Sequence, residues 1–143
     1  MRSGVLVDTG PLVASINRKD RFHAWSREQL GQTAPPLLTC EAVLAESCFL
    51  LRQVPGGSEA ILELLRRGVV KVALRVEDHA AAIMKLMAKY ADFHISLADA
   101  CLVRMSELNP ESVVMTLDSD FGVYRRHGRQ TIPVLMPQTG HVR

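Results

Sequence analysis

The fold class is decided by the stretch VLVDTGP at residues 5–11. Three apolar residues, two of them β-branched, predict a short buried strand over residues 5–7. Asp8 or Thr9 can cap a helix, and Pro11 suits the first helical turn. This segment therefore predicts a strand that runs directly into a helix, with an acidic residue at the junction.

The alternation of strand and helix continues along the chain. Short apolar runs predict strands at residues 37–39, 69–74, 113–116 and 132–135, and the last is expected at a sheet edge because it contains proline. Apolar periodicity and helix-breaking residues predict helices over residues 23–30, 40–52, 58–67, 76–90 and 96–108, with a short one over 117–121. We therefore expect an α/β fold, a three-layer α/β/α sandwich with a mainly parallel sheet of four to five strands.

Length and composition limit the class of protein. A chain of 143 residues fits one domain, which we place at residues 1–143. The net charge of +2 gives no strong argument for a polyanionic partner. Cys40, Cys48 and Cys101 form no CxxC pair, which favours reduced thiols. The apolar stretch before Asp8 is too short for a signal peptide or a membrane span, so we expect a cytoplasmic protein without a membrane partner.

Four acidic residues lie within or directly after apolar runs on separate segments: Asp8, Glu46, Asp99 and Asp118. A buried carboxylate must be paired, protonated or bound to a cation, because burial of an isolated charge is costly. Ligands of open α/β sheets bind outside the carboxyl ends of the strands, and Asp8 and Asp118 both follow predicted strands. We therefore predict one shared acidic site whose carboxylate oxygens suit Mg²⁺ or Mn²⁺.

Three of these acids also have a purely structural interpretation. Asp8 can serve simply as a helix cap. Asp99 lies three residues after Ser96, in an arrangement that resembles a capping box. Asp118 or Asp120 can end a strand and cap the next turn. No single acid decides between the two interpretations. A purely structural interpretation, however, needs a separate explanation for each of the four acids, and all four must hold at once.

Glu46 is the acid that a structural role explains least well. It is the only charged residue between Ala42 and Leu51, and its helical neighbours are apolar, which predicts an inward-facing carboxylate. Glu41 points about 140° away on the same predicted helix, in the first turn, where a negative charge complements the helix dipole. We therefore interpret Glu41 as structural.

Other motifs are weak or absent. The histidines lack the spacing of a zinc site: His23, His79, His94, His127 and His141. The sequence contains no P-loop, GxGxxG or GxSxG motif. Two small basic clusters, at residues 66–71 and 125–129, could meet phosphates, but solvated helix ends explain them better.

The four acids stand in motifs whose order and spacing resemble the PIN domain family. These motifs are VLVDT at residues 5–9, LAE at 44–46, LADA at 97–100 and TLDSDF at 116–121. The resemblance runs almost end to end. It implies a small α/β/α sandwich with a metal-dependent ribonuclease site, as in the VapC-type toxins of bacterial toxin-antitoxin pairs.

Carried over residue by residue, the resemblance places the family's four acids at Asp8, Glu46, Asp99 and Asp118, as both catalytic residues and metal ligands. It implies Mg²⁺ or Mn²⁺ as the cofactor and RNA as the substrate, cleaved to 5′-phosphate and 3′-hydroxyl ends. Asp8, Asp99 and Asp118 would hold the metal, and Glu46 would bind a second ion or assist the attacking water. The resemblance also implies a cognate antitoxin and a homodimer, and the mean hydropathy of +0.09 favours such a partner surface.

The resemblance leaves the part of several neighbouring residues open. Thr116 matches the family's hydroxyl residue near the fourth acid, and Thr9 could hold a backbone group or a water near the first. Asp120 could assist Asp118, and Glu41 could join the site despite its structural explanation. The number of metal ions is open as well.

Two other enzymes and one non-enzymatic role compete with the nuclease. A phosphatase with Asp8 as nucleophile would carry a second aspartate where this chain has Gly10. A response-regulator phosphoacceptor would carry paired acids near the first strand and a lysine near the last, and this chain has neither. A non-catalytic binding module of the same fold, acting through a partner such as an antitoxin peptide, would keep the same framework.

Overall fold

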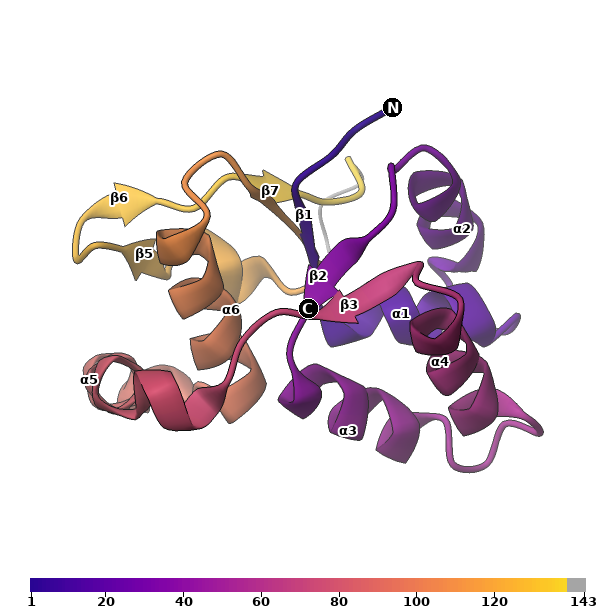
Figure 1. The fold of residues 1–143 in the computed structure, drawn as a ribbon, viewed down its shortest axis with the longest axis horizontal. Coiled ribbons are helices and arrows are strands. Elements are labelled where there is room, and N and C mark those ends of the chain that lie inside the picture. Colours follow the sequence, from indigo (N-terminus) through magenta and orange to yellow (C-terminus); the bar gives the residue numbers. More distant parts are fainter. Residues whose placement is uncertain (139–143) are drawn as a thin grey trace.

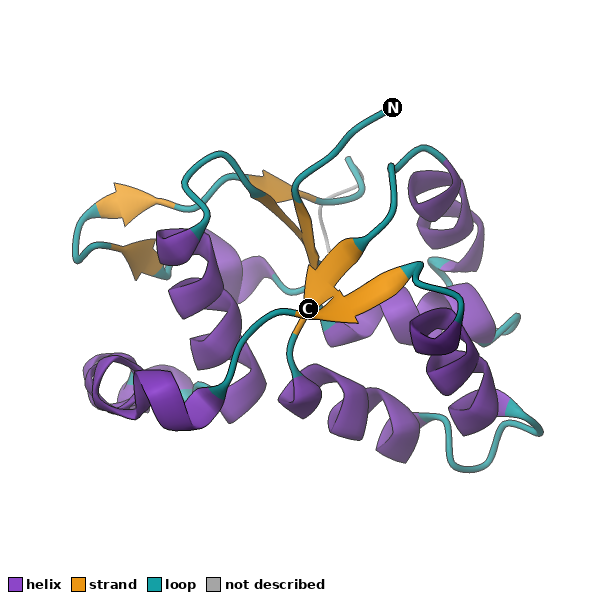
Figure 2. Cartoon of the chain, in the orientation of Figure 1, coloured by secondary structure: helices purple, strands orange, loops and turns teal. Residues whose placement is uncertain are grey.

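A five-stranded sheet runs through the centre of the molecule, with every neighbouring pair of strands parallel. The structure, a computed structural model, describes residues 1–138, so His141 and the end of the predicted domain lie outside the described residues. The strand order is β3-β2-β1-β4-β7. The strands are β1 (Val5–Val7), β2 (Leu37–Thr39), β3 (Val70–Val72), β4 (Val113–Met115) and β7 (Val134–Leu135) (Figure 2).

Helices cover both faces of this sheet. They are α1 (Thr9–Ile16), α2 (His23–Gly31), α3 (Glu41–Leu50), α4 (Gly57–Arg66), α5 (Ala80–Lys89) and α6 (Leu97–Leu108). The chain moves outward from β1 to β2 and β3, then returns to β4 on the other side of β1. Because such crossovers are right-handed, the reversal sends α5 and α6 to the face opposite α1, α2 and α4 (Figure 1). The expected three-layer α/β fold is confirmed.

The central strands are the most deeply buried elements. Val5, Leu6 and Val7 are completely inaccessible to solvent, as a parallel strand covered on both faces should be. Val114 and Met115 of β4 are equally buried, and they continue the same core beside β1. The carboxyl ends of β1 and β4 therefore lie side by side at the centre of the sheet, and an acidic residue follows each strand.

Two predicted elements differ in detail. The helix expected over residues 76–90 is divided into a 3₁₀ turn, Val76–His79, and α5. The edge strand expected over residues 132–135 is confirmed as β7, which within residues 1–138 pairs only with β4, but it comprises Val134 and Leu135 alone. Proline at position 133 has no N–H to donate, so it contributes only its carbonyl, which accepts the N–H of Val114 at 2.9 Å, and the strand itself begins at Val134.

A small antiparallel hairpin was not predicted. It consists of β5 (Arg125–Arg126) and β6 (Gln130–Thr131), with His127 and Gly128 in the left-handed region at φ 52° and 81°. The hairpin is tied to α6, because Glu107 Oε2 accepts the backbone N–H of His127. Its strands are too short and polar to show apolar alternation, so the sequence carries no strand signal there.

The basic cluster at residues 125–129 is partly used within the protein. Arg126 donates to the backbone oxygens of Ser106 and Pro110 at the end of α6. Arg125 donates to three backbone oxygens between residues 122 and 124. These contacts agree with the interpretation of this cluster as a helix-end feature.

Two further observations concern the helices and the cysteines. None of the helices in residues 1–138 is long and apolar enough to cross a membrane. Cys40, Cys48 and Cys101 are all free, as predicted, and Cys40 and Cys101 are buried.

Candidate active site

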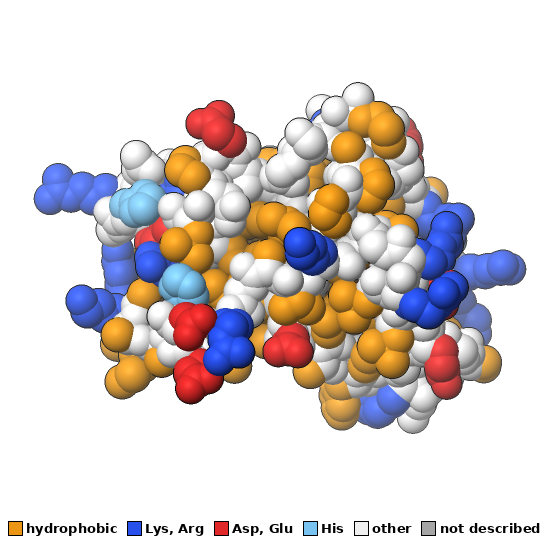
Figure 3. All heavy atoms as spheres, in the orientation of Figure 1, with side chains coloured by type: hydrophobic (Ala, Val, Ile, Leu, Met, Phe, Trp, Pro, Cys, Tyr) orange, Lys and Arg blue, Asp and Glu red, His pale blue; other side chains and the backbone are white. Residues whose placement is uncertain are grey.

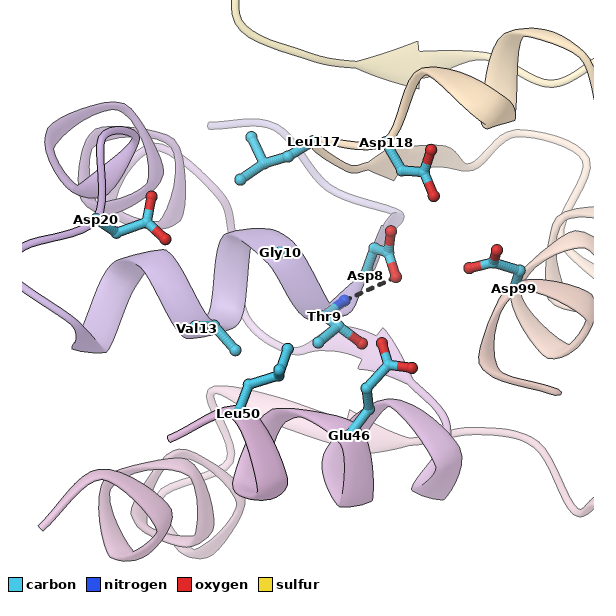
Figure 4. A pocket seen from close by; sticks show the side chains of 10 residues that line it. All are labelled: Asp8, Thr9, Gly10, Val13, Asp20, Glu46, Leu50, Asp99, Leu117 and Asp118. Atoms are coloured by element: carbon cyan, nitrogen blue, oxygen red, sulfur yellow. Dashed lines mark hydrogen bonds between the residues drawn. The ribbon is translucent and has the colours of Figure 1, made fainter. Parts of the chain in front are cut away.

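The structure brings the four predicted acids to one cleft of about 410 Å³ at the carboxyl edge of the sheet. Each acid comes from a different element: Asp8 follows β1, Glu46 lies on α3, Asp99 on α6, and Asp118 follows β4. Their side chains point toward a common centre in Figure 4. Segments more than 100 residues apart in the chain therefore meet as the sequence predicts.

Asp8 is the buried member of the group, with 5% of its surface exposed. Its side chain caps α1, because Oδ1 accepts the backbone N–H of Thr9 at 2.7 Å. Its Oδ2 accepts the hydroxyl of Thr116 at 2.7 Å. The structural interpretation of Asp8 is thus correct, and the same carboxylate also faces the cleft (Figure 4).

Burial raises the pKa of Asp8 to about 7, and the nearby charges of Asp99 and Asp118 add to this effect. The hydrogen bonds from Thr116 and Thr9 lower the pKa but do not cancel the burial. Asp8 therefore holds a proton over much of the range in which an ordinary aspartate is ionised. A cation can replace the proton on such a carboxyl group and bind its oxygens.

Thr116 connects two of the acids. Its side chain is fully buried, and its hydroxyl donates to Asp8 while accepting the backbone N–H of Asp118 at 3.0 Å. Asp118 is half-buried, and its Oδ1 accepts the backbone N–H of Asp120 at 2.9 Å, which caps a 3₁₀ turn at Ser119–Gly122. Thr116 therefore fixes the turn that carries Asp118 relative to the end of β1.

Asp99 lies in the first turn of α6, where the side chain of Ser96 accepts its backbone N–H at 3.0 Å. The predicted cap is present, but the Asp99 carboxylate is free to face the cleft. Burial raises the pKa of Asp99 to about 6, with further contributions from the charges of Asp118 and Glu46. Asp99 thus shares the electrostatic field of the other acids.

Tyr124 is a site residue that the sequence did not reveal. Its ring is fully buried, and its hydroxyl donates to Asp99 Oδ2 at 3.0 Å. Burial, followed by the neighbouring charge of Asp99, raises the pKa of Tyr124 above its ordinary value, so the hydroxyl stays a donor. Tyr124 lies in an irregular turn outside any periodic pattern, and no local signal marks its contact with a helix 25 residues earlier.

The predicted burial of Glu46 is wrong, although its side chain points into the cleft (Figure 4). Glu46 is exposed at the mouth of the cleft, and two of its apolar helical neighbours are exposed as well, Phe49 by 60% and Leu50 by 52%, whereas Val43 is fully buried. The apolar pattern of α3 therefore continues beyond the core onto the surface. Glu46 still lines the cleft, but exposure, not burial, characterises it.

The remaining acids are distributed as follows. Glu41 is exposed in the first turn of α3 and does not line the cleft, which fits its structural interpretation. Asp120 does not line the cleft either, although burial and the charge of Asp118 raise the pKa of its carboxyl. Asp20 was not predicted, yet it lines the far end of the cleft, where its Oδ1 accepts the backbone N–H of Phe22 at 2.8 Å. It stands in a charged loop in which no sequence pattern distinguishes it.

The donor set fits a hard divalent cation. All four acids offer carboxylate oxygens, which suit Mg²⁺ or Mn²⁺, and the two most buried hold their protons unusually tightly. The hydroxyl of Thr9 is buried beside them and has no hydrogen-bond partner within residues 1–138. As the side chains lie, no group of three or more His, Cys, Asp or Glu residues in that range is close enough to hold an ion.

Comparisons with known proteins agree with this fold and cleft. The model of the PIN domain family matches residues 5–126. Ribonuclease VapC26 of Mycobacterium tuberculosis (strain ATCC 25618 / H37Rv) is 26% identical over 132 residues, which cover 91% of this chain and 93% of that protein. The crystal structure of Mycobacterium tuberculosis VapC20, a sarcin-ricin loop cleaving toxin, superposes with a TM-score of 0.74 at 21% identity, over 83% of this chain and 93% of that one.

Proposed function

Because this chain belongs to the PIN domain family, we propose that it is a Mg²⁺- or Mn²⁺-dependent endoribonuclease and the toxin of a toxin-antitoxin pair. The observation that supports this most is the convergence of Asp8, Glu46, Asp99 and Asp118 on one cleft at the carboxyl edge of the sheet. The relative named as a ribonuclease, matched over nearly its whole length, supports the choice of RNA as substrate.

The proposed reaction is hydrolysis of an RNA phosphodiester bond. The oxygen of a water attacks phosphorus, the bond from phosphorus to the 3′ oxygen breaks, and the products carry a 5′-phosphate and a 3′-hydroxyl. A bound divalent cation supplies charge neutralisation at the phosphate and lowers the pKa of the attacking water. Asp8, Asp99 and Asp118 are the residues that would hold this cation, once their carboxylates move closer together than they lie in this structure.

The other residues of the cleft have supporting parts in this proposal. Glu46, exposed at the mouth, is free to reach a water or a second ion. Thr116 orients Asp8, and Tyr124 orients Asp99, each through one hydrogen bond to the carboxylate. Since Asp8 and Asp99 must lose protons to bind a cation, we expect metal affinity to rise with pH between about 6 and 7.

The direct test is cleavage of RNA by the purified protein with Mn²⁺ or Mg²⁺. Activity should be lost in EDTA and in Asp99→Asn, and it should survive in Asp92→Asn, which removes an exposed acid outside the cleft. Sequencing of the RNA ends would identify the cleaved site and the end chemistry. Cleavage that persists in EDTA, or in Asp99→Asn, would contradict the proposal.

A non-catalytic binding module is the second candidate, and the exposed apolar residues beside the cleft favour it. Phe49 and Leu50 lie on α3 and Leu62 lies on α4, all at least half exposed, and Figure 3 shows apolar side chains gathered over these helices. In our proposal this surface serves an antitoxin or a second copy of the chain. Growth arrest on expression, relieved by Asp8→Asn, would distinguish a toxin from a module that only binds.

We also propose that the protein works in the cytoplasm as a homodimer of one-domain chains spanning residues 1–143. The apolar surface on α3 and α4 supports association, and light scattering on the purified protein measures the mass in solution. A mass equal to one chain at all concentrations would contradict the dimer without affecting the proposed chemistry.

A further inference from the structure

We propose that the hydroxyl of Thr9 and the amino end of α1 form a binding subsite for a phosphate oxygen of the RNA chain. The subsite deepens the nuclease function proposed above and rests on it. It assigns a role in substrate binding to neutral donors that stand beside the acids but are not acids themselves.

The first observation is an unpartnered hydroxyl. Thr9 is 4% exposed and lines the cleft, yet its Oγ1 makes no hydrogen bond to any residue in the described range 1–138. Figure 4 shows this oxygen on the side of Thr9 that faces Glu46 and the open cleft. A buried hydroxyl without a partner is unfavourable, because it loses its hydrogen bonds to water on folding. A hydroxyl that faces a cleft in this condition lacks the partner that a ligand oxygen would supply.

The second observation is the position of Thr9 on its helix. Thr9 is the first residue of α1, and its own N–H is occupied by Asp8 Oδ1 at 2.7 Å. The first N–H groups of a helix have no partner inside the helix, and the third residue of α1 is Pro11, which has no N–H. Gly10 also lines the cleft, and as the second residue of α1 it has an N–H that lacks a partner inside the helix. Amino ends of helices favour anions.

The chemistry of these donors selects a phosphate oxygen. A hydroxyl and an amide N–H both donate, and a phosphodiester presents only acceptors, whereas base edges present a mixture. The carboxylates repel an anion, so phosphate binding requires a cation, held by Asp8, Asp99 and Asp118, that would offset their charge. Thr9 and Gly10 would then receive a phosphate oxygen without adding charge. Such a contact positions the RNA and carries no sequence information.

A substitution of Thr9 can test substrate binding without lowering the stability of the protein. Thr9→Val keeps the shape of the side chain and the N–H that Asp8 accepts, but it removes the hydroxyl. Because that hydroxyl makes no hydrogen bond within residues 1–138, the melting temperature of Thr9→Val should equal or exceed that of the wild type. Thr9→Ser keeps the hydroxyl and serves as the conservative variant.

The test measures binding of a 3′-fluorescein-labelled, 5′-phosphorylated RNA dinucleotide by anisotropy at constant Mn²⁺. The dissociation constant should rise about tenfold in Thr9→Val, the effect of one hydrogen bond to a charged group, and return toward wild type in Thr9→Ser. The effect should be the same for dinucleotides of different sequence. Ser26→Ala is the matched control, because Ser26 is also fully buried with an unpartnered hydroxyl but lies outside the cleft.

Two results would overturn the subsite. One is wild-type affinity of Thr9→Val for the dinucleotide. The other is loss of the Mn²⁺-induced rise in melting temperature in Thr9→Val, which would assign the hydroxyl to the cation. Failure of the nuclease proposal has a different signature, namely a wild-type protein that neither cleaves RNA nor responds to Mn²⁺.

Discussion

Asp8 performs two tasks with one carboxylate. Each of its oxygens accepts one hydrogen bond, from the N–H of Thr9 and from the hydroxyl of Thr116, so the side chain is fixed at the end of β1. The same burial that fixes it also penalises its charge and raises its pKa to about 7. A single residue thus stabilises the start of α1 while its ionised form destabilises the metal-free protein.

The pH dependence of stability follows from this. The pKa of Asp8 is higher in the folded protein than in the unfolded chain, so between pH 4 and pH 7 the folded protein binds more protons. In EDTA, the stability that protonated Asp8 contributes is therefore complete below about pH 4 and lost as pH rises through about 7. Asp99, with a pKa of about 6, adds a loss of the same sign.

Asp8→Asn removes the charge and should therefore restore the stability that the wild type loses when Asp8 ionises. In EDTA at pH 8, we expect Asp8→Asn to melt about 5 °C or more above the wild type, and the difference should shrink toward pH 4. The loss of one hydrogen bond from Thr9 or Thr116 reduces the gain at every pH. A wild type that becomes more stable from pH 4 to pH 7 relative to Asp8→Asn would show that the pKa shift has the opposite sign.

Tyr124 and Tyr90 form a natural pair for testing the site. Their rings meet edge to face at 5.1 Å, and both are buried, but only the Tyr124 hydroxyl reaches an acid of the cleft. Tyr90 accepts the backbone N–H of Arg125 instead. The two phenylalanine substitutions therefore remove the same group from one aromatic cluster at different distances from the cleft.

Tyr124→Phe should weaken the rise in melting temperature that Mn²⁺ causes, because Asp99 loses the donor that orients it. Tyr90→Phe should leave that rise unchanged while costing about 1 kcal/mol of stability, the value of one buried hydrogen bond. Thermal melts at increasing Mn²⁺ concentration measure both. Equal Mn²⁺ responses in the two variants would show that the hydrogen bond to Asp99 does not support the site.

Among the helices, α1 shows how packing holds the cleft together. Its second residue, Gly10, lies against Leu117 of the turn that leads to Asp118, and a Cβ at Gly10 would approach the Leu117 side chain to 3.2 Å. Leu117 is itself 1% exposed and packs against Ala14 of α1. This close contact holds the start of α1, and with it Asp8, against the segment that carries Asp118.

Gly10→Ala should therefore lower stability by about 1 kcal/mol, because crowding against a buried leucine exceeds the gain in helix propensity. Gly31→Ala is the control, since Gly31 is also helical but nothing lies within 4 Å of its added Cβ, and it should raise stability by up to about 1 kcal/mol. Chemical denaturation measures both. A Gly10→Ala protein as stable as Gly31→Ala would mean that Leu117 moves aside freely.

In the whole molecule, the cleft joins elements from both layers of helices. Asp8 and Asp118 extend from neighbouring strands of the sheet, whereas Glu46 and Asp99 come from α3 and α6, and these two helices contact each other. Like charges from four elements repel one another unless protons or a cation neutralise them. A cation bound here would therefore stabilise the tertiary arrangement as a whole, not one element.

Millimolar Mn²⁺ should accordingly raise the melting temperature of the wild type at pH 7.5. At a hundredfold excess over the dissociation constant, linkage gives about 2.7 kcal/mol, or roughly 5–10 °C for a chain of this size. EDTA should reverse the rise, and Asp118→Asn should diminish it. Identical melting of the wild type with and without Mn²⁺ would contradict a metal site in this cleft.

The sequence alone was sufficient for the order of the elements that form the parallel sheet and its helices, and for the meeting of Asp8 and Asp118, whereas Glu46 and Asp99 were joined to them through the family resemblance. Apolar runs mark the strands because parallel strands are buried on both faces, and residues that follow such strands must reach one edge of the sheet. The caps at Asp8 and Ser96 were equally visible, because capping depends on neighbours one to three residues away. These are local properties, and local sequence determines them.

Only the tertiary structure decided which apolar surfaces are buried and which distant groups touch the acids. The pattern around Glu46 predicted burial, but the end of α3 extends beyond the core, and Phe49 and Leu50 reach solvent while Val43 stays buried. The contacts of Tyr124 with Asp99 and of Thr116 with Asp8 span 25 and 108 residues, and no periodicity encodes such distances. Burial and long-range contacts depend on how whole helices and strands pack against one another. No short stretch of sequence specifies that packing, so it is visible only in the folded structure.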